Sequence, residues 1–158
     1  MVLIMIIISV LATLNKHATP ARDERDIRVT YPLVSNTWPW REATTAGFEV
    51  LRSQHALFTN TSERTHRRLN GLVATLSSCE VRMCDHTVGW DGSPDSTGRV
   101  SLDAMVFDGP TWDSGAVGFL QYSPHAAAIA RDVMIYTAES ILTGSGADRF
   151  ARLMGYAP

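Results

Sequence analysis

The sequence predicts a single α+β domain in which helices pack on a β-sheet. Val100–Phe107 and Gly115–Leu120 are rich in strand-forming residues and flank a turn that opens at Asp108-Gly109-Pro110, which is the pattern of an antiparallel hairpin. Apolar residues recur at helical spacing before and after this hairpin. With 158 residues, 45% of them hydrophobic, the chain is long enough for one core and short for two.

The chain before the hairpin is expected to hold a strand and two helices. Ile27–Asn36 carries β-branched and aromatic residues and is predicted to be a strand that ends at the proline-containing run Asn36–Trp40. Glu42–Ser53 has apolar residues at helical spacing and is predicted to be a helix. Phe58–Asn70 shows no apolar stripe, so we expect a solvated loop or helix face. A short amphipathic helix should follow over Leu69–Cys79.

Beyond the hairpin, the sequence predicts two further helices separated by a short strand. Ser123 is the expected N-cap of the first helix, with Pro124 at its first position. Glu139–Thr143 is the predicted strand, and the last helix should be capped by Ser145 and closed by Gly155. The side chains predicted to be buried are Ala126, Ile129, Ala130, Val133 and Met134 on the first helix, and Phe150, Leu153 and Met154 on the second.

The N-terminal segment has the composition of a secretory signal. Met1–Leu14 is almost wholly apolar but shorter than the about 20 residues that cross a hydrocarbon core, and cleavage is expected after Ala21. A buried strand over Ile6–Val10 and an uncleaved anchor are the alternatives. The expected division of the chain is signal peptide 1–21, exposed leader 22–30 and folded domain 31–158. We therefore expect the secretory pathway, and no membrane association after cleavage.

Two cysteines and an N-glycosylation sequon are consistent with the secretory pathway. Cys79 and Cys84 are an even pair, which in an oxidising compartment predicts a local disulfide. Cysteines at this separation cannot bridge within a continuous helix, where they lie about 7.5 Å apart along the axis, so the helix should stop or unwind at Cys79. A metal site with His86 as third ligand is the alternative, but a fourth ligand at suitable spacing is missing, and no metal is expected. Asn60-Thr61-Ser62 predicts glycosylation of Asn60.

Charge excludes some classes of partner. The formal net charge is −2 and the isoelectric point is about 6.2, which gives no field that would gather nucleic acid or an anionic membrane. The basic cluster within Glu63–Arg68 lacks the interleaved aromatic residues of a nucleic-acid site. We expect neither nucleic acid nor a cofactor to bind.

Several motifs occur in an order that resembles one known family. They are Val88-Gly89-Trp90-Asp91-Gly92-Ser93-Pro94-Asp95 within a turn-rich loop, Leu102-Asp103-Ala104-Met105, Asp108-Gly109 and Gly115-Ala116-Val117-Gly118. Together they resemble the front portion of a glycosylasparaginase (aspartylglucosaminidase), an N-terminal-nucleophile hydrolase. The resemblance implies a partial αββα sandwich of that fold, first half only, over residues 31–158. The run Asn36–Trp40 is similar to the end of the family's first strand, which implies that Trp38 lines the substrate site, and Cys79–Asp85 is similar to its short disulfide loop.

The resemblance also implies a chemistry. Family members are lysosomal amidohydrolases that cut themselves before a threonine, whose hydroxyl then attacks the amide joining asparagine to N-acetylglucosamine while its freed amine acts as base. This sequence contains no Asp-Thr pair, so no catalytic residue is assigned, and we expect the chain to be inactive alone. It also has Asp91-Gly92 where the family has two glycines, and an aspartate there would resist a positive φ.

Two other functions stay open. The chain could be a non-catalytic partner or decoy that binds the missing β-subunit or a full-length relative. It could also be a relative of isoaspartyl peptidases and L-asparaginases, although Asn36-Thr37-Trp38 stands where those enzymes carry a glycine-rich run. The substrate implied by the family is a glycosylated asparagine.

Overall fold

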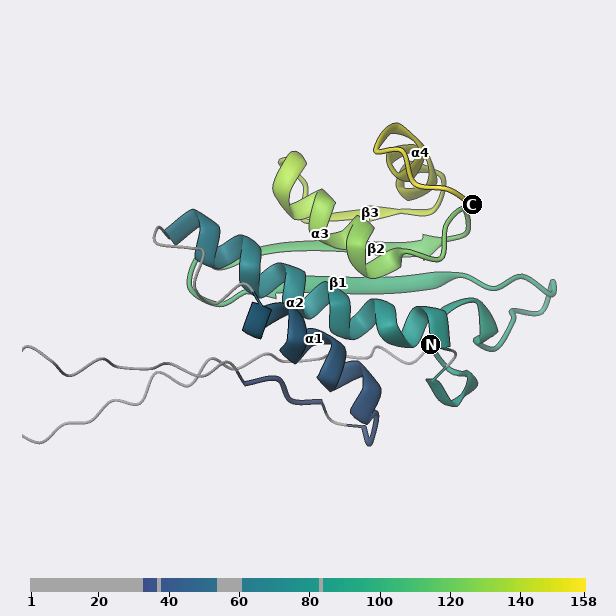
Figure 1. The fold of residues 1–158 in the computed structure, drawn as a ribbon. Coiled ribbons are helices and arrows are strands. Elements are labelled where there is room, and N and C mark those ends of the chain that lie inside the picture. The colour runs from purple at the N-terminus through teal and green to yellow at the C-terminus, as the bar shows by residue number, and fades with distance from the viewer. Residues whose placement is uncertain (1–32, 37, 54–60, 83) are drawn as a thin grey trace, which may run out of the picture.

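A computed structural model describes residues 33–36, 38–53, 61–82 and 84–158, with the side chains of 61–64 and 85 left aside (Figure 1). The described residues form four α-helices and three β-strands. In chain order these are α1 (Arg41–Ser53), α2 (Thr61–Arg82), β1 (Leu102–Asp108), β2 (Asp113–Leu120), α3 (Ala126–Tyr136), β3 (Ile141–Thr143) and α4 (Gly144–Leu153). This mixture of helices with a small sheet confirms the coarse α+β class.

The sheet has three strands in the order β1-β2-β3. β1 and β2 pair antiparallel, which confirms the hairpin, and β3 pairs parallel to β2 after the chain has crossed over through α3. The ladder is irregular between Leu102 and Ala104, where the carboxylate of Asp103 accepts a hydrogen bond from the backbone N–H of Phe119 at 2.9 Å. Phe119 has a φ of 50°, so the irregularity bends the strand at its end.

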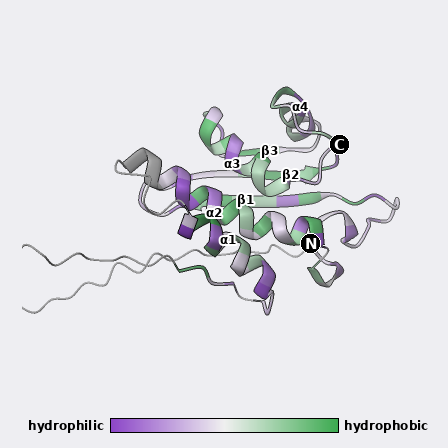
Figure 2. Cartoon of the chain, viewed as in Figure 1, coloured by the Kyte–Doolittle hydropathy of each residue, from purple (hydrophilic) through white to green (hydrophobic). Residues whose placement is uncertain are grey.

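One face of the sheet carries the core. α3 packs on β1 and β2, α4 packs on β2 and β3, and α2 packs on β1 and α3, while α1 lies against α2 (Figure 1). α2 is hydrophilic near its start and becomes hydrophobic toward its middle, where it meets the core (Figure 2). The buried residues that meet there are Leu69, Leu72, Leu102, Val106, Val117, Leu120, Ala126, Ile129, Ala130, Val133, Ala147 and Ala151.

The opposite face of the sheet is open in the described structure. Met105 and Ile141 flank Ala116 across the three strands and are 50% and 54% exposed. Phe107 is 46% exposed and makes an edge-to-face contact with Trp112, whose side chain is 80% exposed. We call Met105, Phe107, Trp112 and Ile141 the outer face. Its apolar side chains lack the helical cover that the core side has.

α2 is longer than the sequence suggests. Over Phe58–Asn70 we expected a solvated loop or helix face, and from Thr61 onward the chain is helical, with a tertiary contact that supports the polar first half of the helix. The guanidinium of Arg68 donates to both carboxylate oxygens of Asp108, at 2.9 and 3.2 Å from one nitrogen, and Asp108 is 3% exposed. A partly buried, bidentate ion pair of this kind joins residues that are distant in sequence. The local pattern of apolar residues therefore does not predict it.

α2 also continues past Cys79, so the prediction that it stops there is wrong by less than one turn. The helix ends at Arg82, before Cys84, which lies in a short 3₁₀ turn over Cys84–His86. The geometric requirement behind the prediction holds, since the helix unwinds between the two cysteines.

The predicted caps of the last two helices are wrong. α3 has His125 at its N-cap, and Ser123 is fully buried with no hydrogen-bond partner for its hydroxyl in the described structure. α4 has Thr143 at its N-cap rather than Ser145. At the start of α3 the local motif failed because a tertiary contact supplies the polar partner, since Glu80 accepts the N–H of Ala127.

The buried face of α4 is smaller than predicted. Ala147 and Ala151 are fully buried and Phe150 packs against the core, but Leu153 is 79% exposed and Met154 is 36% exposed. The helix leaves the sheet at its last turn. Gly155, with a φ of 83°, closes the helix as predicted.

Several predictions fall on residues outside the described ranges. These are the signal peptide 1–21, the leader 22–30, most of the strand Ile27–Asn36 and the sequon at Asn60. Leu33–Asn36, the described end of that strand, shows no strand structure. Among the described helices, none combines the length and apolar composition needed to cross a membrane.

Replacing Gly47 with alanine should loosen the contact between α1 and α2. A Cβ at this position would lie 2.7 Å from the carbonyl oxygen of Gly71 and would overlap the hydroxyl of Thr75. We expect Gly47→Ala to lower the free energy of unfolding by about 1–3 kcal/mol, measured by urea denaturation. Gly146→Ala in α4 is the matched control, because a Cβ there meets open space and should cost nothing. Equal effects of the two substitutions would contradict a tight crossing at Gly47.

Candidate functional site

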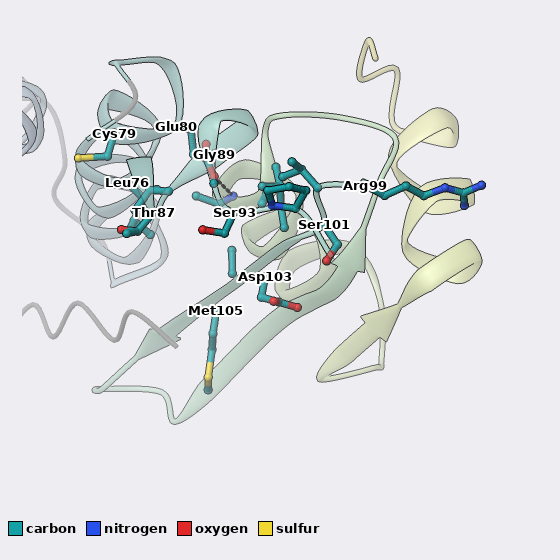
Figure 3. A pocket seen from close by; sticks show the side chains of 18 of the residues that line it. Leu76, Cys79, Glu80, Thr87, Gly89, Ser93, Arg99, Ser101, Asp103 and Met105 are labelled. Atoms are coloured by element: carbon teal, nitrogen blue, oxygen red, sulfur yellow. Dashed lines mark hydrogen bonds between the residues drawn. The ribbon is translucent and has the colours of Figure 1, made fainter. Parts of the chain in front are cut away.

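A cavity of about 540 Å³ lies where the end of α2, the loop before β1, the first half of β1 and the start of α3 meet. Figure 3 shows side chains from these segments around it, among them Glu80, Ser93 and Asp103. Its polar lining comes from Glu80, Thr87, Ser93, Asp95, Arg99, Ser101 and Asp103, and its apolar lining includes Trp40, Leu76, Val88, Val100, Ala126 and Ala127.

A disulfide shapes one wall of the cavity. Cys79 and Cys84 are bonded, with their Cα atoms 5.0 Å apart, which confirms the predicted local disulfide. With both thiols bonded, the alternative metal site that used them with His86 is excluded. The described residues also hold no group of three or more His, Cys, Asp or Glu side chains that could bind a metal.

The loop after the disulfide folds back on α2 through a glycine. Gly89 has a φ of 76°, and a Cβ there would lie 2.5 Å from the carbonyl oxygen of Glu80. Only glycine fits such a close backbone approach. Asp91 does not adopt the positive φ that an aspartate would resist: it lies in a 3₁₀ turn (Gly89–Asp91), and its carboxylate contacts the ring of His86.

Glu80 is the buried charge-bearing group of the site. Its side chain is at the cavity wall but only 9% exposed, and Oε1 accepts a hydrogen bond from the backbone N–H of Ala127 at 2.8 Å. This bond satisfies an N–H at the positive end of the α3 dipole. Oε2 has no hydrogen-bond partner in the described structure.

Burial raises the pKa of the Glu80 carboxyl above its ordinary value of 4.5. The bond from Ala127 and, to a smaller extent, the Ser77 hydroxyl oppose this rise, although Ser77 does not reach hydrogen-bonding geometry with Oε2. Sequence reasoning missed Glu80. A signal was present, because Leu69, Leu72, Leu76 and Glu80 share one helical stripe, which places a carboxyl on the apolar side of α2.

The turn-rich loop predicted over Asp91–Gly98 is confirmed, and Asp95 organises it. Oδ1 of Asp95 accepts hydrogen bonds from the backbone N–H of Thr97 at 2.7 Å, from the Thr97 hydroxyl at 2.6 Å and from the N–H of Arg99 at 3.1 Å. These bonds, led by that from the Thr97 hydroxyl, lower the pKa of the Asp95 carboxyl. Asp95 thus holds the loop that forms the cavity's outer wall.

Trp38, the predicted substrate-site residue, lies near the cavity but not on its wall. Its ring stacks on that of Trp40 with centroids 6.0 Å apart and an interplanar angle of 18°, and its side chain is 46% exposed. Trp40 lines the cavity. The structure therefore places an aromatic pair at the rim and adds Trp40 to the residue that the sequence singled out.

The described lining of the cavity combines acidic, neutral polar and apolar side chains. It contains carboxyl, hydroxyl and apolar groups, its one cysteine is in the disulfide, and none of its residues is a histidine that could act as base.

Comparison with known proteins identifies the class of protein to which this fold and site belong. Residues 31–158 match the model of the asparaginase 2 family, whose description is asparaginase, so the chain belongs to that family.

Several curated proteins are similar to this chain. It is 39% identical over 125 residues to N(4)-(β-N-acetylglucosaminyl)-L-asparaginase of Mus musculus and 38% identical to the Rattus norvegicus protein of that name. It is also 38% identical to a putative N(4)-(β-N-acetylglucosaminyl)-L-asparaginase of Drosophila melanogaster. The aligned stretch covers 79% of this chain and 33%, 33% and 30% of these proteins, respectively. The chain thus spans about a third of the length of the curated relatives it matches.

Because the pKa of Glu80 is raised in the folded chain, the stability of the fold should depend on pH. Because the folded state favours the protonated carboxyl, its contribution to stability is fully present below the ordinary pKa of 4.5 and is lost as the pH rises through the higher folded-state pKa. We expect thermal unfolding of the wild-type chain to show this loss above pH 4.5, and Glu80→Gln to reduce it. Glu139→Gln, at an exposed position, should keep the wild-type profile. Parallel profiles for wild type and Glu80→Gln would contradict the assignment.

Proposed function

We propose that this chain supplies the first part of a glycosylasparaginase-type amidohydrolase and does not hydrolyse substrate alone. The observation that carries the proposal is its 39% identity to N(4)-(β-N-acetylglucosaminyl)-L-asparaginase of Mus musculus over 125 residues, which are 79% of this chain. The substrate class taken from that name is a glycosylated asparagine.

The need for a partner segment follows from chemistry. An N-terminal threonine is a nucleophile because its own α-amine removes the hydroxyl proton, and an internal threonine has no such amine. The sequence has no Asp-Thr pair, and the cavity lining offers no histidine as a substitute base. Residues of another segment would have to provide the reacting groups.

The outer face supports the same proposal. Met105, Phe107 and Ile141 present an apolar surface on a sheet whose other face is already covered. Such a surface suits a second sheet, because packed sheets bury their facing side chains in a shared core. The complete arrangement would be the αββα sandwich of N-terminal-nucleophile hydrolases, of which this chain holds one sheet and its helices.

Charging the outer face should make the isolated chain more soluble. An exposed apolar sheet face promotes association. We expect the double substitution Met105→Lys and Phe107→Lys to increase the monomer fraction in light scattering and to reduce binding of a hydrophobic dye. Leu153→Lys, which adds a lysine at a 79% exposed position at the end of α4, should change neither quantity. A wild-type chain that is already a clean monomer without dye binding would contradict the proposed open surface.

The activity prediction is direct. Incubated with N(4)-(β-N-acetylglucosaminyl)-L-asparagine, the purified chain should release no aspartate above the blank. Turnover by the chain alone would overturn the proposal.

Trp38 can be tested once activity is restored by co-expression with the part of the Mus musculus relative that lies outside the aligned 125 residues. As a substrate-site wall, Trp38 should support binding, so Trp38→Ala should raise KM severalfold with a smaller change in kcat. Tyr136→Ala, which removes an aromatic side chain that is 64% exposed at the end of α3, outside both the outer face and the cavity lining, is the matched control.

A binding role is the second candidate, and the outer face is the observation that favours it. A chain that covers a relative's exposed sheet without supplying a nucleophile would act as a non-catalytic partner or decoy.

Similarity to proteins named glycosylasparaginases favours the glycosylasparaginase type over the isoaspartyl peptidase alternative. The disulfide is in keeping with passage through the secretory pathway to a lysosomal or secreted destination, with Asn60 as the proposed glycosylation site.

A further inference from the structure

The cavity holds one carboxylate oxygen that nothing in the described structure satisfies. Oε1 of Glu80 is bonded to Ala127, whereas Oε2 is buried at the cavity wall without a partner. A buried polar atom without a hydrogen bond lowers the stability of the fold. A ligand that donates a hydrogen bond to this atom would therefore bind more tightly. The cavity of about 540 Å³ beside it has room for a small organic molecule.

The charged groups around the cavity indicate which charge a bound molecule would carry. The lining contains three carboxyl groups, those of Glu80, Asp95 and Asp103, and one guanidinium, that of Arg99. The positive end of α3 would favour an anion, but the carboxyl of Glu80 already occupies it. A second anion would face Glu80 without a free helix end to offset the repulsion. The lining therefore favours a cationic donor.

The apolar lining selects an organic cation over a bare ion. Leu76, Val88 and Val100 offer carbon surface, and Trp40 offers an aromatic ring whose position is fixed by stacking on Trp38. Aromatic faces attract ammonium groups, and apolar walls bind the carbon atoms that carry them. A bare metal ion would find too few ligands, since no group of three candidate ligands exists among the described residues.

We propose that this cavity binds a small organic ammonium compound, whose ammonium group donates to Oε2 of Glu80 and whose carbon atoms contact the apolar lining and Trp40. The proposal goes beyond the proposed function, because binding here needs neither a nucleophile nor a partner segment. It can therefore fail while the glycosylasparaginase assignment stands, and the reverse also holds.

The test compares two probes of nearly equal shape, benzylamine and benzyl alcohol, on the full chain with its disulfide intact. We expect benzylamine to bind at least about tenfold more tightly in calorimetry, because a charge-assisted bond replaces a neutral one. In NMR spectra, the amides of Gly89 and Ala127 should shift on titration with benzylamine. Equal affinities, or shifts confined to other regions of the chain, would overturn the proposal.

Substitution of Glu80 identifies the group responsible. Glu80→Gln keeps an acceptor for the N–H of Ala127 but removes the charge, so it should abolish the preference for benzylamine and leave the affinity for benzyl alcohol unchanged. Glu139→Gln, the same change at an exposed position away from the cavity, should keep the preference. A persistent preference in Glu80→Gln would overturn the proposal. If Glu80→Gln does not fold, the comparison of the two probes on the wild-type chain decides the matter.

Discussion

The carboxyl of Glu80 accepts the N–H of Ala127 across a separation of 47 residues, and much of the architecture depends on this contact. It joins the end of α2 to the start of α3, two helices that pack on the same sheet. Without it, the first turn of α3 would present an unpaired N–H in a buried place, since neither Ser123 nor His125 caps the helix with its side chain. A single tertiary acceptor replaces the local cap.

The surroundings of Glu80 keep that carboxyl in place. Cys79, the residue before Glu80, is held by its disulfide to Cys84. Gly89 lets the loop after the disulfide lie against the carbonyl oxygen of Glu80. Asp95 then stabilises the loop as it leads to β1. Three kinds of constraint, covalent, steric and hydrogen-bonded, thus converge on one turn of helix. The cavity is the space that they leave between the loop, the sheet and α3.

The sequence predicted what local patterns determine. Local patterns predicted the hairpin, α1, the disulfide and a short strand over Glu139–Thr143, of which Ile141–Thr143 forms β3, because each depends on neighbours in the chain. Contacts between residues distant in sequence could not be predicted in this way. The first half of α2 is supported by Arg68 meeting Asp108, so composition alone left a loop and a helix face equally open there, and the start of α3 depends on Glu80, so the local cap motif misled. The cavity shows the same division: the motif resemblance indicated Trp38, which does not line the cavity, whereas its lining residues Trp40 and Glu80 became apparent only from the fold.

α1 meets the rest of the described structure mainly through α2, and the stacked pair Trp38 and Trp40 directly precedes its first turn. The position of the aromatic pair therefore depends on a helix contact that lies outside the cavity, because a change that weakens the packing of α1 on α2 also displaces the ring of Trp40 in the cavity wall. The affinity of a ligand in the cavity would then respond to substitutions that touch none of the residues around it.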